Sequence, residues 1–255
     1  MTWDCIIGID CATAAEKTGL ARAVRGEAGW VLVEAMSGAE VVPVEQVAEW
    51  ISAAERPLLC IDAPLGWPVA LGQSLAEHRA GAGIGPGADE LFHRRCDSFI
   101  HERTGCRPME VGANFIARTA RAALGLLAEV REHSRRHLPL LWHPGAGDEG
   151  GVIEVYPAAT LRMHELPWRR YKPAAELERR DIIMEGFGET LALPGAHSAA
   201  TQALRTQADV LDAAVCILAG IDFLEGQAMA PPRLDEDLAK EGWIWTRRGS
   251  APSPA

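Results

Sequence analysis

The sequence predicts a single α/β domain built around a mixed sheet. Two short apolar runs each end in an acid, at Asp10 and at Asp62, which is typical of buried strands that lead into a site. A helical pattern lies between the two runs, and strand, helix and strand in this order imply a right-handed crossover and a parallel pair. The composition, 48% hydrophobic and 24% charged over 255 residues, is ordinary for a globular protein.

The first quarter of the chain accounts for most of the predicted sheet. The run Cys5–Asp10 is apolar and β-branched, and two further strands follow it at hairpin spacing, with glycines marking the turn between them. Pro43 suits the first position of a helix whose apolar residues fall on one face. We therefore expect antiparallel strands at 18–24 and 30–35, a helix at 43–53 and a parallel strand at 58–62.

The rest of the chain is predicted to be mostly helical. The glycine-rich stretch 81–87 is interpreted as a loop rather than a phosphate cradle, because it follows no predicted strand and contains a proline. One more core strand is expected at 152–156, and a last edge strand at 242–246. Helices are expected at 88–103, 112–133, 158–164, 174–186 and about 200–225.

The strands up to 152–156 give a five-stranded mixed sheet, with three antiparallel strands followed by parallel ones, flanked by helices; the edge strand at 242–246 would be added to it. We assign residues 1–248 to one domain with a helical insertion at about 70–150, and residues 249–255 to a disordered end.

Charge and composition narrow the class of protein. The net charge of −10 does not favour nonspecific nucleic-acid binding, although basic residues cluster locally, notably at 162–172. No stretch approaches the roughly 20 apolar residues that a membrane span requires, and no signal peptide is recognisable. The six cysteines form no C-x-x-C pair and are expected to be reduced. A cytoplasmic protein that does not contact a membrane is the expectation.

Five acids form the candidate site. Asp10 and Asp62 end strands at the sheet edge where α/β proteins bind ligands, although Asp also caps turns. Asp209 and Asp212 lie three apart on one side of an apolar helix, where solvation or pairing with arginine is the alternative. Glu154 lies within a core strand, and for it an arginine salt bridge is as good an interpretation as a role beside a metal.

The chemistry of these side chains favours a hard cation. All five are carboxylates, and no His or Cys stands at metal-ligand spacing, so Mg²⁺ or Mn²⁺ fits better than zinc. Metal ions held by carboxylates can activate water and stabilise the leaving oxygen of a phosphodiester. The sequence therefore predicts an Mg²⁺- or Mn²⁺-dependent nuclease that acts on DNA or RNA.

Several segments resemble a prokaryotic family of unknown function whose members are described as predicted nucleases with an RNase H-like fold. The family is distantly similar to Holliday-junction resolvases, although those usually carry Glu where this chain has Asp62. The resemblance covers nearly the whole chain to about Trp245 and rests on residues 8–10, 60–68, 94–97, 107–111, 154–159, 171–172 and 209–213.

The resemblance implies the roles of individual residues. Metal-side carboxylates would be Asp10, Asp62, Asp209 and Asp212, with Glu154 joining or supporting them as a catalytic residue. Substrate contacts would come from Arg94, Arg95, Asp97, Tyr156 and Lys172.

Two other functions stay open. An ATP-dependent phosphotransferase of the actin and sugar-kinase type opens with a similar strand, but the glycine run of its second phosphate loop is missing after Asp62. A catalytically inactive RNase H-like binding protein would retain the acids without the chemistry.

Overall fold

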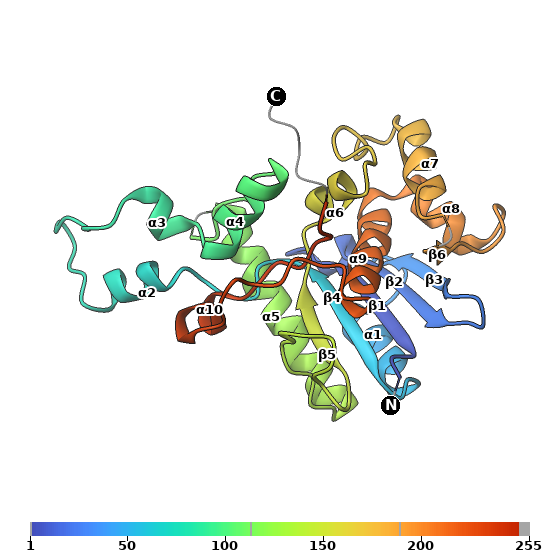
Figure 1. The fold of residues 1–255 in the computed structure, drawn as a ribbon, viewed down its shortest axis with the longest axis horizontal. Coiled ribbons are helices and arrows are strands. Elements are labelled where there is room, and N and C mark those ends of the chain that lie inside the picture. The colour runs from blue at the N-terminus through green and yellow to red at the C-terminus, as the bar shows by residue number, and fades with distance from the viewer. Residues whose placement is uncertain (1, 113, 189, 250–255) are drawn as a thin grey trace.

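A computed structural model describes residues 2–112, 114–188 and 190–249. At its centre lies a mixed sheet of six strands in the order β5-β4-β1-β2-β3-β6 (Figure 1). Their bounds are β1 Cys5–Asp10, β2 Gly19–Arg25, β3 Trp30–Ser37, β4 Pro57–Asp62, β5 Gly151–Glu154 and β6 Leu191–Ala192.

The strand directions place the two acidic strand ends side by side. Strand β2 runs antiparallel to both β1 and β3, whereas β4 is parallel to β1 and β5 is parallel to β4. In the register between β1 and β4, Asp10 is opposite Asp62. The predicted mixed α/β architecture and this parallel pair are therefore confirmed.

The strand count and the chain ends differ from expectation. The sixth strand, β6, pairs in parallel with the edge strand β3 through two residues, too short a run to give a period-2 pattern. The expected edge strand at 242–246 is instead an isolated bridge, in which the Trp245 amide donates to the Glu154 carbonyl at 2.9 Å. Of the end predicted to be disordered, residues 250–255 lie outside the described residues.

Two expected helices are each divided. The stretch predicted at 88–103 is broken because Arg94 is extended (φ −81°, ψ 162°) and caps the second piece with Asp97. The long helix expected from about 200 is broken at Gln207, which is also extended. The helices are α1 Pro43–Ser52, α2 Val69–Ala76, α3 Ala88–Phe92, α4 Arg95–Thr104, α5 Asn114–Ser134, α6 Pro157–Met163, α7 Leu177–Glu185, α8 Ala199–Thr206, α9 Ala208–Leu224 and α10 Glu236–Glu241, with a 3₁₀ turn at Ala15–Lys17.

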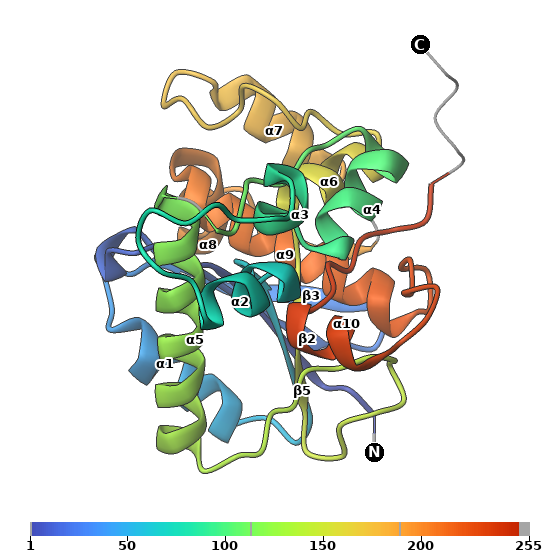
Figure 2. The ribbon, with the colours of Figure 1, turned by 90° about the vertical axis from the view of Figure 1, so that its left-hand side faces the viewer.

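Helices cover both faces of the sheet. Because side chains alternate along a strand, Ile7 and Ile9 of β1 face α1 and α5, whereas Ile6 faces α9. Helices α1 and α5 lie side by side (Figure 2), so α5 completes the core although it belongs to the stretch expected as an insertion. Helices α2 and α3 extend away from the sheet (Figure 1).

Two glycines bring α9 against the sheet. A Cβ atom on Gly8 would overlap the carbonyl oxygen of Ala213, and one on Gly19 would overlap that of Asp209. The missing side chains therefore let the backbone of α9 lie directly on β1 and β2. This close packing sets the first two turns of α9, which carry Asp209 and Asp212, beside the end of β1.

The remaining composition-based expectations concern cysteines and membrane spans. All six cysteines are free and buried, as predicted for reduced core thiols. None of the helices within the described residues is long and apolar enough to cross a membrane.

Candidate active site

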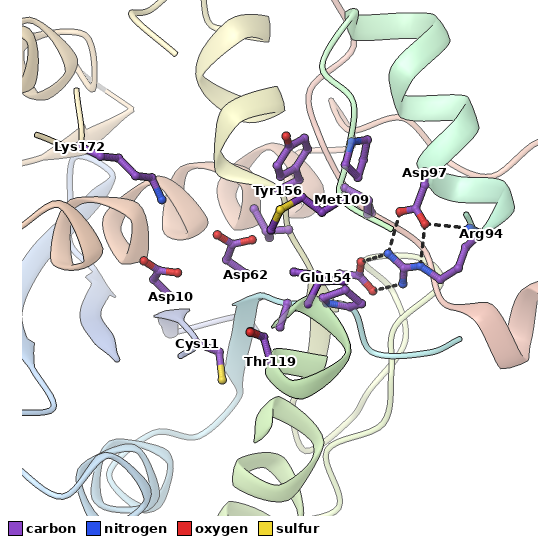
Figure 3. Close-up of a pocket in the computed structure, with 16 residues that line it drawn as sticks. Asp10, Cys11, Asp62, Arg94, Asp97, Met109, Thr119, Glu154, Tyr156 and Lys172 are labelled. Atoms are coloured by element: carbon purple, nitrogen blue, oxygen red, sulfur yellow. Dashed lines mark hydrogen bonds and ion pairs between the residues drawn. The ribbon is translucent and has the colours of Figure 1, made fainter. Parts of the chain in front are cut away.

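Three carboxylates meet where β1, β4 and α9 come together. Asp10 and Asp62 end adjacent parallel strands, and their carboxylates lie side by side and point the same way (Figure 3). Asp212 comes from the second turn of α9 and is fully buried. We call Asp10, Asp62 and Asp212 the acid cluster.

The partners of Asp212 come from the segment between α6 and α7. The hydroxyl of Tyr171 donates to Asp212 Oδ1 at 2.7 Å, and Nζ of Lys172 forms an ion pair with Oδ2 at 2.6 Å. Arg180 fixes this segment, because its buried guanidinium donates to the carbonyl oxygens of Tyr171 and Lys172. The Lys172 side chain is nevertheless 58% exposed. Its ammonium can therefore move into solvent without breaking the core.

The acid cluster holds more negative charge than its surroundings neutralise. Burial raises the pKa of Asp62 to about 7, and the charge of Asp212 adds to that shift. Burial, followed by the charges of Asp62 and Asp212, holds the pKa of Asp10 well above its usual range. Burial also raises the pKa of Asp212, with Lys172 opposing the shift. Three acids thus share one lysine at low dielectric, an arrangement that stabilises any added cation.

Two residues of the acid cluster, Asp10 and Asp62, line a pocket of about 270 Å³, whereas the fully buried Asp212 does not line it. Lys172 approaches from one side, while Tyr156 and Met109 lie on the other (Figure 3). Asp10, Asp62 and Lys172 line its acidic end. The remaining lining residues are Cys11, Ala63, Pro64, Arg94, Asp97, Pro108, Met109, Ile116, Thr119, Glu154, Val155, Tyr156 and Ile244.

A second group of buried charges lies against the same pocket. The Arg94 guanidinium is 1% exposed and donates to both oxygens of Glu154, at 2.6 and 2.8 Å, and to both oxygens of Asp97, at 2.9 and 3.1 Å. A fifth hydrogen bond reaches the carbonyl oxygen of Glu241 at 3.0 Å. We call Arg94, Asp97 and Glu154 the arginine cluster. All five N–H donors of Arg94 are committed within the protein.

The arginine cluster bears on two expected roles. Glu154 also accepts from the Leu65 amide at 2.9 Å, so the arginine salt bridge is the interpretation that its contacts favour over coordination of a metal. Arg94 lines the pocket but has no N–H left for a phosphate.

Two further expected site residues lie outside the pocket. The Arg95 guanidinium does not line the pocket; it donates two hydrogen bonds to Asp235, at 2.6 and 3.0 Å, and its Nε lies 3.5 Å from Glu241 Oε2. Asp209, in the first turn of α9, does not line the pocket, although its charge raises the pKa of both Asp10 and Asp212.

The donor set of the acid cluster suits a hard divalent cation. Its oxygen atoms are all carboxylate, the ligands that Mg²⁺ and Mn²⁺ prefer. As they stand, no three His, Cys, Asp or Glu side chains among the described residues are close enough to hold one ion. Lys172 instead contacts Asp212. Coordination would therefore require rotation of the carboxylates and withdrawal of the exposed lysine.

Several residues of the site were not apparent from the sequence. Tyr171 lies in a segment that carries the resemblance, but its contact with Asp212 was not predicted. Ile116 and Thr119 line the pocket, and buried Glu241 accepts from the amides of Val69 and Arg95 at 3.0 Å. These contacts join parts of the chain far apart in sequence. Only the position of Met109 in a short loop between two predicted helices gave a local signal.

Fold and site together define a mixed α/β domain with an acidic pocket at the carboxyl ends of adjacent parallel strands. The family model described as "Protein of unknown function (DUF429)" matches residues 8–236. The chain belongs to this family, and the matched range contains every residue of the acid and arginine clusters. Neither the curated proteins nor the solved structures give a significant match to the chain.

Proposed function

We propose that this protein is a divalent-metal-dependent nuclease that hydrolyses phosphodiester bonds of nucleic acid. The observation that carries the proposal is the acid cluster: the buried Asp212 and the half-buried Asp10 and Asp62 share one exposed lysine, and the latter two line a pocket. Such an excess of buried negative charge is costly unless a cation compensates it. A compensating cation at this place is exposed to whatever enters the pocket.

The sheet supports the resemblance to the RNase H-like fold. Three antiparallel strands come first, and the next two strands are parallel to the first, as the resemblance implies. The sixth strand, β6, is an addition at the far edge of the sheet. The acids stand on the first strand, on the fourth strand and on α9. This agreement in strand arrangement and in the placement of the acids supports metal-dependent hydrolysis at the acid cluster.

The residues of the acid cluster and their neighbours would each have a distinct role in the hydrolysis. Asp10, Asp62 and Asp212 would hold Mg²⁺ or Mn²⁺, which when bound would lower the pKa of a water and stabilise the leaving oxygen. Tyr171 orients Asp212 through its hydroxyl. Lys172, once released from Asp212, would contact a phosphate oxygen. Asp209 would act only through its charge.

The arginine cluster would hold the wall of the pocket in place and take no part in the hydrolysis. Through Arg94, it ties α4 to the end of β5 and to the last residue of α10. Those contacts hold the wall of the pocket that faces the acid cluster.

Backbone phosphates would be held by the basic segment between α6 and α7. There, Arg169 stacks on the ring of Trp168, and Arg162 stacks on the same ring from the last turn of α6, with 3.9 and 5.0 Å respectively from the ring centre to the guanidinium carbons. The same segment leads directly to Lys172. Positive charge is therefore available beside the acid cluster despite the net charge of −10.

A cleavage screen tests the proposal. Single-stranded, duplex, hybrid and branched substrates are incubated with the purified protein and Mn²⁺ or Mg²⁺, with Asp10→Asn prepared in parallel to detect contaminating nucleases. We expect metal-dependent cleavage of at least one substrate by the wild type and none by the variant. Failure of the wild type on all four forms, or equal cleavage by Asp10→Asn, would reject the proposal.

A further inference from the structure

The pocket beside the acid cluster has two chemically different ends. One end carries the carboxylates of Asp10 and Asp62 and the ammonium of Lys172. The rest of the lining includes five apolar side chains, which we call the apolar end: Pro108, Met109, Ile116, Val155 and Ile244. The arginine cluster lies beside them (Figure 3), with its charges paired to one another. A ligand that fills this pocket therefore needs an anionic, metal-seeking part joined to a flat or apolar part.

The segment between α4 and α5 supplies Pro108 and Met109 to the apolar end. Two hydrogen bonds hold this segment in place: the Val111 amide donates to the Phe92 carbonyl at 2.9 Å, and the Tyr156 hydroxyl donates to the Arg107 carbonyl at 3.3 Å. Met109 nevertheless remains 64% exposed. A large apolar side chain that is exposed at the rim of a pocket is typical of a binding surface.

A second hollow lies on the other side of the same wall. Met109 and Ile116 line both hollows, and the second one, of about 440 Å³, also contains Phe115 and Arg107. Phe115 is 72% exposed, so its ring is available for stacking. Successive bases of a single strand stack on such apolar and aromatic side chains regardless of sequence.

We propose that the substrate is single-stranded or locally unpaired nucleic acid, and that one base enters the apolar end of the pocket. This inference rests on the proposed nuclease function. The phosphate attached to that nucleotide would lie at the acid cluster, and the neighbouring base would stack on Phe115. At about 270 Å³, the pocket is close to the lower end of small-molecule sites, roughly 300 Å³, so it accepts one nucleotide unit but not a base pair. A paired base would have to leave its stack to enter.

Binding measurements test this inference without relying on cleavage. Fluorescence anisotropy is recorded with a labelled single strand of about 12 nucleotides, as DNA and as RNA, and with the matching duplexes. Ca²⁺ supplies an oxygen-seeking cation in place of Mg²⁺, and gel electrophoresis verifies that the strand stays intact. The variants are Met109→Ala and Phe115→Ala, and the matched control is Leu234→Ala, a side chain 51% exposed that lines neither hollow.

We expect the single strand to bind about 10-fold more tightly than the duplex, and each of the two variants to weaken single-strand binding by about 5-fold or more, since one stacked base contributes about 1–3 kcal/mol. Leu234→Ala should bind as the wild type does. Equal affinity for single strand and duplex, or wild-type binding by both Met109→Ala and Phe115→Ala, would overturn the inference.

The two proposals fail in different ways. Metal-dependent cleavage of duplexes with the same efficiency as single strands would remove the single-strand site but leave the nuclease. Conversely, the expected binding pattern without cleavage in any metal would support the base site and reject the nuclease.

Discussion

The acid cluster and the arginine cluster lie against one pocket, the first half-buried apart from the fully buried Asp212 and the second buried throughout, and their charges are neutralised to different degrees. In the arginine cluster, one guanidinium with five hydrogen bonds meets two carboxylates and a carbonyl oxygen. In the acid cluster, three carboxylates share the ammonium of Lys172, which is largely exposed. The first arrangement is complete within the protein, whereas the second leaves charge to be met by a ligand.

This difference separates a structural role from a functional one more clearly than burial or residue type does. Both clusters contain acids that a sequence motif picks out, and the family match covers both. From the number of partners of each carboxylate, we propose a structural role for Glu154 and a chemical role for Asp10. Four substitutions test this proposal.

The largest effect is expected for activity in Asp10→Asn. Loss of one metal-side carboxylate should reduce metal-dependent cleavage by about three to four orders of magnitude, which corresponds to about 4–5 kcal/mol of barrier. The melting temperature in EDTA should not fall, because the variant removes buried excess charge. Initial rates and circular dichroism melts measure both quantities. A variant that unfolds, or that cleaves as the wild type does, would remove Asp10 from the active site.

The next effect is on stability, in Arg94→Ala. Without the guanidinium, Glu154 and Asp97 are left buried and unpaired, which should lower the free energy of unfolding by about 3–5 kcal/mol. Urea unfolding measures the change. Arg95→Ala is the matched control, because its half-exposed side chain pairs at the surface and should cost far less. Equal losses in the two variants would contradict the structural role of the arginine cluster.

A smaller effect depends on pH and is expected in Asp62→Asn. Folding raises the pKa of Asp62 from 3.8 to about 7, so the folded state retains a proton that the unfolded state releases. The stability of the metal-free wild type should therefore fall as the pH rises from about 4 to about 7. The amide of the variant does not titrate. The free energy of unfolding of Asp62→Asn should therefore rise relative to that of the wild type by on the order of 1–3 kcal/mol between pH 4 and pH 8.

Urea unfolding of both proteins in EDTA at several pH values measures that difference. Parallel stability curves for wild type and Asp62→Asn would show that Asp62 carries no such strain.

The smallest effect is expected in Lys172→Met. Removing the shared ammonium should lower metal-free stability by about 1 kcal/mol or less, since the lysine is largely exposed. Saturating Mn²⁺ should restore it, because the cation takes over the neutralisation of Asp212. Melting temperatures with EDTA and with Mn²⁺ measure the two states. A loss that Mn²⁺ does not reverse would separate the lysine from the cation site.

Sequence patterns predicted those strands and helices whose formation depends on residues close together in the chain. The apolar runs ending at Asp10 and Asp62, and the wholly apolar helix around Asp212, were recognisable because burial and periodicity depend on neighbouring residues. The two-residue strand β6 was missed because it depends on the neighbouring strand β3 rather than on its own pattern.

Sequence patterns did not predict which residues contact the acids. The sequence left Glu154 open between arginine and metal, since the choice depends on Arg94, 60 residues away. Likewise, the break at Gln207 and the placement of Asp209 outside the pocket follow from how α9 docks on Gly8 and Gly19. Contacts of this kind appear only once the fold is known.

The most direct test of the central claim is calorimetric titration of Mn²⁺ into the wild type, Asp10→Asn and Glu154→Gln, each verified as folded by circular dichroism. If the acid cluster holds the cation and the arginine cluster is structural, the wild type and Glu154→Gln will bind Mn²⁺ and Asp10→Asn will not. Absence of binding to the wild type, or loss of binding in folded Glu154→Gln together with retention in Asp10→Asn, would contradict the account.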